Sequence, residues 1–87
     1  MRYVISPDAA CAPVEDGTVV LNMRTKRYYS LNQTGAVIWQ MLENDAPVPT
    51  VVAHLVASYD IDTTTAAHTV TQLLDALTSE ALITPAR

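Results

Sequence analysis

Residues 25–42, TKRYYSLNQTGAVIWQML, decide the fold because their apolar pattern changes period in mid-run. The residues before Asn32 are typical of a β-strand. After it the apolar residues repeat at spacings of three and four, as in a helix, and they are Val37, Ile38, Met41 and Leu42. The side chain of Asn32 or Thr34 is expected to cap the first turn of that helix. The sequence therefore predicts one strand that runs almost directly into one helix.

A hairpin precedes this junction. Residues 15–17, Glu-Asp-Gly, have turn chemistry, and residues 18–22 after them are β-branched and apolar, which favours a strand. Residues 24–26 then close a turn, and residues 27–31 form the returning strand. Hairpin 18–31 is therefore the centre of the predicted sheet.

The first strand of the sheet is less sharply defined by the sequence. Residues 3–5 or residues 10–14 have the composition of a short strand. Pro7 and Pro13 would interrupt such a strand or confine it to an edge of the sheet, because proline has no amide hydrogen to donate. Both alternatives remain open from the sequence.

Side chains alternate between the two faces of the returning strand. Tyr29 and Leu31 lie on one face, whereas Tyr28 and Ser30 lie on the other. Because helices follow the hairpin, we expect Leu31 and Tyr29 to face the core.

Two helices follow in sequence order. The first is predicted over residues 34–43 and must end before Pro47, and Gly35 in its first turn is expected to allow a close approach to the hairpin. Pro49 suits the first turn of a second helix, which ends near Asp60. The apolar stripe predicted for this second helix consists of Val48, Val52, Leu55, Val56 and Tyr59.

A third helix is predicted from a cap at Asp62 to about Glu80, and a short apolar tail, Leu82 and Ile83, returns to the core. These elements predict an α+β fold for a single domain over residues 1–87. The expected architecture is a small winged helix-turn-helix, with an N-terminal three-stranded antiparallel sheet followed by three helices.

Composition limits the cellular context. The chain has 87 residues, 49% of them apolar, which suffices for one small core. No apolar stretch approaches the roughly 18 residues of a membrane span, and no export signal is evident at the N-terminus. Cys11 is the single cysteine, so no disulfide within the chain is possible. We expect a cytoplasmic protein without membrane association.

The distribution of charge argues against nucleic acid as a partner. The net charge is −4, and no Lys or Arg occurs between Tyr28 and Ala86. A helix that reads DNA must face a dense row of phosphates, which would repel the acidic second and third helices. The basic residues of the hairpin, Arg24, Lys26 and Arg27, are more typical of a solvated turn.

The run TVVLNMRTKRYYSLNQTGAVIWQML resembles the PqqD family and its relatives, the recognition elements for precursors of ribosomally made, post-translationally modified peptides. The similarity covers about residues 15–84, and its most diagnostic piece is YYSLNQTGAVIW. It continues with Leu55, Tyr59, Val70, Leu73, Leu77 and a closing Ala-Leu-Ile. The short, free-standing chain resembles the small recognition proteins of lasso-peptide gene clusters.

The resemblance implies a non-catalytic adapter without a cofactor. Family members bind the leader segment of a precursor peptide and deliver it to a leader peptidase, a cyclase or other maturation enzymes. The leader adds as an antiparallel strand beside residues 27–31, in a groove against the third helix. An exposed strand edge offers main-chain hydrogen bonds to such a peptide independently of any resemblance. A peptide chaperone of PQQ biosynthesis and an acidic winged-helix regulator remain the alternatives.

The third helix has a wide apolar arc with two flanks that suit a groove. One flank carries Ala66, Thr69 and Leu73, and the other carries Ala67, Thr71 and Leu74. The resemblance favours the first flank, because relatives often have an acidic residue at position 69. The predicted peptide-binding residues are Arg27, Tyr28, Tyr29, Ser30, Leu31, Ala66, Thr69, Val70 and Leu73.

The chain departs from the pattern of its relatives at three positions. Thr69 cannot pair with a basic residue of a leader, so charge recognition at that position is lost. Lys26 and Ala81 stand where relatives often have glycine. Neither of these two changes is expected to threaten the fold.

Other reactive side chains form no motif. Cys11, His54 and His68 are too scattered for a zinc pattern, and neither histidine forms a recognisable nucleophile pair with the cysteine. Trp39 and Tyr59 are predicted to anchor the core rather than to contact a ligand.

Overall fold

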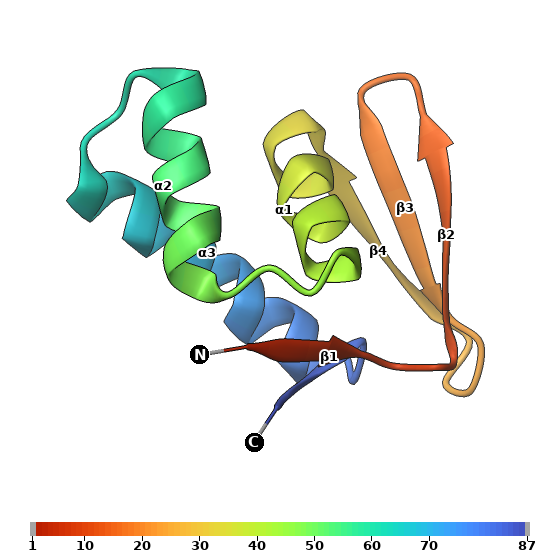
Figure 1. The fold of residues 1–87 in the computed structure, drawn as a ribbon. Helices are drawn as coiled ribbons and strands as arrows, with labels where there is room; N and C mark the ends of the chain where they lie inside the picture. Colours follow the sequence, from red (N-terminus) through yellow and green to blue (C-terminus); the bar gives the residue numbers. More distant parts are fainter. Residues whose placement is uncertain (1, 87) are drawn as a thin grey trace.

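The computed structural model describes residues 2–86, which form two antiparallel sheets and a layer of helices (Figure 1). In chain order the elements are β1 (Tyr3–Ile5), β2 (Ala9–Val14), β3 (Gly17–Asn22), β4 (Arg27–Asn32), α1 (Gln33–Glu43), α2 (Val48–Tyr59), α3 (Thr63–Ser79) and β5 (Ile83–Pro85). The larger sheet has the order β2-β3-β4, and the helices lie on one side of it.

Both candidate first strands form, in different sheets. β2 pairs with β3 and completes the predicted three-stranded sheet, whereas β1 pairs with the tail strand β5. Pro13 lies in β2, an edge strand, where its missing amide hydrogen costs no ladder bond. The prediction of a single sheet is therefore wrong: the two ends of the chain form a second one, and no local pattern indicates that pairing.

The junction between β4 and α1 has no linker. Asn32 is the last residue of β4 and also the N-cap of α1, and its Oδ1 accepts a hydrogen bond from the amide of Gly35 at 2.8 Å. Of the two predicted caps, Asn32 is the one used. A Cβ added to Gly35 would lie 3.2 Å from the Cβ of Leu31, so the predicted close approach is confirmed. α1 is thereby held against the inner face of the sheet.

The second helix contacts the core through four of the five residues of its predicted stripe, but its most buried side is shifted from the stripe. Val51 is fully buried beside Leu55 although the stripe omitted it, whereas Tyr59 is exposed although the stripe included it. Val52 and Val56 only border the core. The valines of α2 and Leu55 span an arc of about 140° at 100° per residue, which is wider than the stripe that a core-facing helix needs. The hydrophobic pattern therefore does not decide which side of that arc is buried, and packing against α3 makes the choice.

One hydrophobic core joins the sheet to all three helices. Trp39 is buried, as predicted, and so are Leu82 and Ile83 of the returning tail. The core consists of Val20, Leu31, Ile38, Trp39, Leu42, Val51, Leu55, Ala66, Val70, Leu74, Leu77, Leu82 and Ile83. Leu31 faces this core as expected, and Tyr29 is half-buried.

The predicted α+β class is confirmed, with three strands of one sheet preceding three helices. The winged arrangement of these helices stays a prediction. None of the helices in residues 2–86 has both the length and the apolar character that a bilayer span requires.

α3 ends in a turn that favours glycine. The amide of Ala81 donates to the carbonyl of Thr78 at 3.0 Å, and the amide of Leu82 donates to the carbonyl of Leu77 at 3.0 Å. This pair of bonds is a Schellman motif, in which the residue after the cap adopts the left-handed conformation. Ala81 has a φ of 58°, as the motif requires. The sequence contains alanine where the backbone geometry favours glycine.

Replacing Ala81 with glycine should therefore stabilise the protein. A left-handed L-residue costs about 1–2 kcal/mol, and the larger conformational freedom of glycine in the unfolded chain offsets part of that gain. We expect the free energy of unfolding, measured by urea titration, to rise by roughly 0.5–1 kcal/mol. Ala76→Gly, inside α3, is the matched control and should lower it by about 1 kcal/mol. A loss of stability in Ala81→Gly would contradict the assigned turn.

Candidate functional site

β4 is an edge strand of the larger sheet. β3 pairs with one edge of β4, and within residues 2–86 no strand pairs with the other. In an antiparallel ladder every second residue of an edge strand directs its amide and carbonyl away from its partner. β4 therefore offers a row of unpaired main-chain donors and acceptors to an incoming segment.

A groove of about 560 Å³ lies beside β4 and is closed on its far side by α3. We call it the β4–α3 groove. The groove is lined by Tyr29, Ser30, Leu31, Asn32, Thr34, Gly35, Ile38, Leu55, Tyr59, Ile61, Thr65, Thr69, Gln72 and Leu73. These residues come from β4, from all three helices and from the connection between α2 and α3.

The lining is apolar at its base and neutral throughout. Leu31, Ile38 and Leu55 are buried core residues that form the base. Thr65, Thr69 and Gln72 bring polar but uncharged groups from α3. Since none of the lining residues is charged, the groove suits an apolar or neutral side chain that enters from a segment lying along β4.

Acidic residues lie near both ends of α3, and Asp75, which lies within α3, is not part of the groove lining. At the N-terminal end, Asp60 and Asp62 flank the lining residue Ile61. Hydrogen bonds from the hydroxyl and the amide of Thr65 lower the pKa of the Asp62 carboxyl, and the amide bond is 2.7 Å long. Asp62 is thus ionised at neutral pH and caps α3, as predicted.

Three of the five residues predicted on β4 line the groove. They are Tyr29, Ser30 and Leu31. Tyr28 lies on the opposite face of the sheet and is 69% exposed. Arg27 lies at the hairpin end of β4, outside the lining.

The four residues predicted on α3 divide into two pairs. Thr69 and Leu73 line the groove, whereas Ala66 and Val70 are fully buried in the core. The groove therefore lies against the flank that carries Thr69. The opposite flank does not line the groove; it consists of Ala67, Thr71 and Leu74.

Nine of the lining residues were not among the predicted binding residues. Five of them belong to the β4–α1 junction and to the core, and they are Asn32, Thr34, Gly35, Ile38 and Leu55. The other four come from α3 and from the bend before it. Thr65 and Gln72 lie four residues before and three after Thr69, so helical spacing alone would have indicated them. Tyr59 and Ile61 carry no such signal. Tyr59 was predicted to anchor the core, which is wrong: it is 41% exposed and lines the groove. The bend between α2 and α3 brings both residues there, and that bend depends on tertiary packing.

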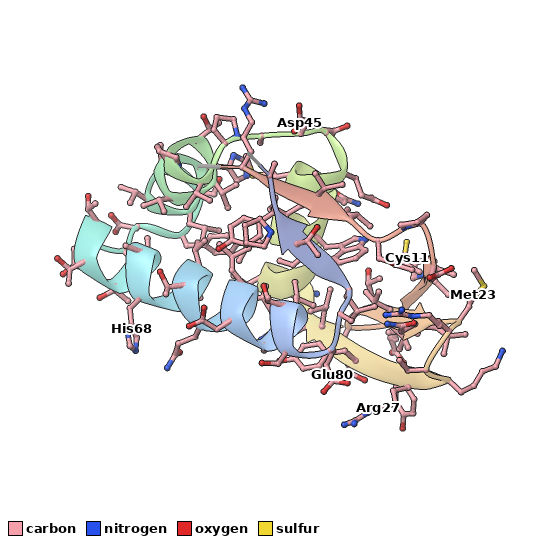
Figure 2. The ribbon with its side chains drawn as sticks, turned by 90° about the horizontal axis from the view of Figure 1, so that it is seen from below. Cys11, Met23, Arg27, Asp45, His68 and Glu80 are labelled. Carbon is pink, nitrogen blue, oxygen red and sulfur yellow. The ribbon has the colours of Figure 1, made fainter. Side chains whose placement is uncertain are left out.

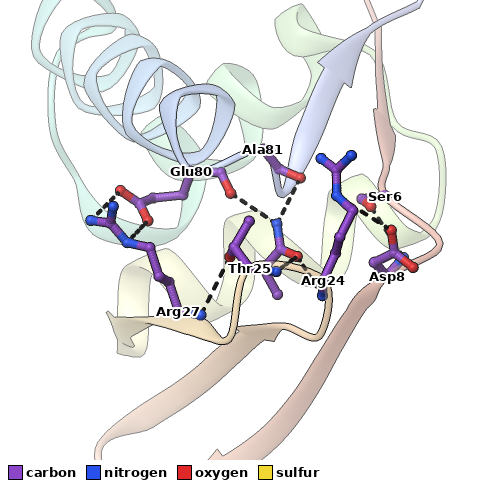
Figure 3. A network of polar contacts seen from close by, with 8 residues as sticks. Ser6, Asp8, Arg24, Thr25, Arg27, Glu80 and Ala81 are labelled. Carbon is purple, nitrogen blue, oxygen red and sulfur yellow. Dashed lines mark hydrogen bonds and ion pairs between the residues drawn. The ribbon is translucent and has the colours of Figure 1, made fainter.

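A buried side-chain amide joins the hairpin to the end of α3. Nδ2 of Asn22 donates to the carbonyls of Glu80 at 3.1 Å and Ala81 at 3.3 Å. Its Oδ1 accepts from the amides of Arg24 at 3.0 Å and Thr25 at 3.2 Å. Figure 3 shows this network of contacts between the hairpin turn and the end of α3. Asn22 thus fixes the hairpin relative to the helix that closes the groove.

An ion pair lies next to this network. Nε of Arg27 is 3.1 Å from Oε1 of Glu80, and Nη2 of Arg27 is 3.3 Å from Oε2 (Figures 2 and 3). The Arg27 side chain is 72% exposed, so the pair contributes at most about 1 kcal/mol to stability. Its two-point geometry holds the start of β4 near the end of α3.

Metal-binding side chains do not gather anywhere in the described part of the chain. Among residues 2–86, no three His, Cys, Asp or Glu side chains lie close enough to hold a metal ion. Cys11 is exposed, with its Sγ 3.8 Å from Oε2 of Glu43.

An open strand edge beside a neutral groove on a small α+β scaffold is the arrangement that peptide-binding domains use for strand addition. The model of the family described as Coenzyme PQQ synthesis protein D (PqqD) matches residues 17–83. The chain belongs to this family, and the resemblance noted in its sequence is confirmed.

Two solved structures are similar to the chain over nearly its whole length. TbiB1, in complex with the TbiA(beta) leader peptide, has a TM-score of 0.89 and 27% identity, over 97% of this chain and 98% of that one. A lasso peptide synthetase B1, complexed with the leader peptide, has a TM-score of 0.84 and 27% identity, over 98% of this chain and 100% of that one. A search of curated proteins finds no significant match.

Removing the Asn22 side chain should destabilise the protein strongly. Asn22→Ala leaves two carbonyls and two amides without their partner, and unpaired buried groups cost about 1–3 kcal/mol. We expect the free energy of unfolding to fall by roughly 2–3 kcal/mol in a urea titration. Asn44→Ala changes an exposed asparagine and should shift it by less than about 0.5 kcal/mol. Equal effects of the two variants would contradict the structural role of Asn22.

Proposed function

We propose that the chain is a non-catalytic adapter that binds the leader segment of a ribosomally made precursor peptide. It presents this leader to processing enzymes, a leader peptidase and a cyclase, in lasso-peptide biosynthesis. The observation that carries the proposal is the open edge of β4 beside the β4–α3 groove. Its support is the family membership and the two similar structures, both of which contain a leader peptide.

The leader is proposed to add antiparallel to β4 and to extend the sheet by one strand. Its main chain pairs with the open amides and carbonyls of residues 27–31. Alternate side chains then point toward the helices, and one of them enters the β4–α3 groove. Main-chain pairing supplies affinity for any extended segment, whereas the neutral, apolar groove supplies the preference for a particular leader.

The predicted binding residues take different parts in this proposal. Tyr29, Ser30 and Leu31 form the strand and one wall, and Thr69 and Leu73 form the other wall. Arg27 and Tyr28 contact the ends and the outer side of the added strand. Ala66 and Val70, which are buried, support the α3 wall from behind.

The adapter is further proposed to perform no chemistry of its own. The lining contains hydroxyl and amide groups but no His, Cys, Asp, Glu or Lys that could act as a base or nucleophile. A single domain over residues 1–87, acting in the cytoplasm, completes the proposal. DNA is disfavoured as a ligand because neither α2 nor α3 contains Lys or Arg.

Hydrogen exchange tests the binding mode. The probe is the leader segment of a precursor peptide encoded beside this chain. Because pairing protects backbone amides, added leader should slow exchange in residues 27–31, with the largest effect in that segment. Protection confined to α2 would show that the peptide binds elsewhere.

A bulky residue at the wall of the groove should block the leader without unfolding the protein. Thr69 is only partly buried, so Thr69→Trp should fill the groove and weaken leader binding at least ten-fold, about 1.4 kcal/mol, with little change in melting temperature. Titration calorimetry with the same leader measures the effect. Thr71→Trp, at an exposed position on the opposite flank, is the matched control and should leave the affinity unchanged.

A core truncation separates binding from folding. Leu77 is fully buried, and Leu77→Ala should lower the free energy of unfolding by roughly 2–5 kcal/mol.

Unchanged leader affinity in folded Thr69→Trp protein would exclude this wall of the groove as the binding site.

A further inference from the structure

A leader strand added beside β4 has two main-chain edges, and β4 pairs with only one of them. Alternate residues of an extended strand direct their amide and carbonyl groups to opposite edges. The second edge of the leader faces α3, because α3 closes the far side of the β4–α3 groove. Main-chain groups that leave water need hydrogen-bond partners, since an unpaired buried group costs free energy. The second edge therefore calls for polar side chains on α3.

Three polar residues of α3 line the groove, and they are Thr65, Thr69 and Gln72. The hydroxyl of Thr65 is bonded to the carboxylate of Asp62, so it already serves the cap of α3. Thr69 and Gln72 differ from it, because within residues 2–86 neither the hydroxyl nor the carboxamide has a hydrogen-bond partner. These two side chains are therefore free to bond to a molecule in the groove.

The spacing of Thr69 and Gln72 suits a single leader residue. The two positions are three apart on α3, so they are neighbours on one side of the helix, about 4.5 Å apart along its axis. Residues of a strand that face the same edge recur at about 6.8 Å. Because the spacing on the helix is the shorter one, the two side chains meet one such residue rather than two. A hydroxyl and a carboxamide can each donate and accept, so together they match one amide and one carbonyl.

We propose that Thr69 and Gln72 hydrogen-bond the main chain of one leader residue at its second edge, and this inference rests on the proposed adapter function. The leader is then held by main-chain bonds on both edges, by β4 on one side and by α3 on the other. These bonds read no side chain, but they require an amide hydrogen. Proline is therefore disfavoured at that one position of the leader.

Near-isosteric variants that remove the polar groups test the contact. Thr69→Val and Gln72→Met keep the approximate size of each side chain and lose its hydrogen bonds. Each variant should weaken binding of the leader segment encoded beside this chain about five-fold, the equivalent of about 1 kcal/mol. Titration calorimetry measures the affinity, and an unchanged melting temperature shows that the variants are folded.

A backbone ester scan of the same leader identifies the contacted atoms. An ester in place of one peptide bond removes an amide hydrogen and weakens the preceding carbonyl as an acceptor. The affinity lost through each ester is compared between the wild type and the double variant Thr69→Val/Gln72→Met. At one leader residue, or at it and the next, the loss should be at least about three-fold smaller in the double variant, because the partner is already missing. At all other positions the two losses should agree.

Thr71→Val and Gln40→Met are the matched controls. Both positions are exposed and neither lines the groove. Leader affinity should therefore stay within about two-fold of the wild-type value in both controls.

Three results would overturn the inference while leaving the adapter function intact. Wild-type affinity in both α3 variants is the first. The second is an equal ester loss in the wild type and the double variant at every position, since weaker binding would then come from shape alone. The third is a five-fold loss in Tyr59→Phe with wild-type affinity in both α3 variants, which would place the contact on α2. Failure of the adapter function itself appears separately, as absent leader binding by the wild-type chain.

Discussion

The groove depends on one buried amide group. Among residues 2–86, Asn22 is the single buried polar residue, and its side-chain donor and acceptor both have hydrogen-bond partners. Through it the hairpin turn is bonded to carbonyls at the end of α3, 58 and 59 positions away in the chain. Because a buried amide is expensive to leave unpaired, this contact admits little change in the angle between the hairpin and α3. The width of the groove follows from that angle.

A second constraint keeps the edge of β4 open. Asn32 ends β4 and caps α1 at once, so α1 must fold back onto the inner face of the sheet. There it packs against β3 and β4, and within residues 2–86 no strand pairs with the other edge of β4. α3 then lies opposite that edge and contributes neutral side chains to the space between them. The result is an unpaired strand next to an apolar hollow, which are the two parts that strand addition needs.

The proposed site is neutral. None of the residues that line the β4–α3 groove is charged, although the chain as a whole is acidic. Main-chain pairing and apolar contact, rather than charge, are the interactions that this scaffold offers to its partners.

The sequence by itself determined the elements whose causes are local. The change of apolar period at Asn32, the caps at Asn32 and Asp62, and the turn residues defined the hairpin and three helices. The sequence also showed that the three helices contain no Lys or Arg. Only the tertiary structure decided the pairing of β1 with β5, the buried face of α2 and the place of Tyr59 in the groove. The strand pairing and the position of Tyr59 bring together residues that are distant in the chain. The buried side of α2 is one of several apolar sides of the same helix. In each case the free energy that decides the outcome comes from tertiary packing, which a local sequence pattern does not show.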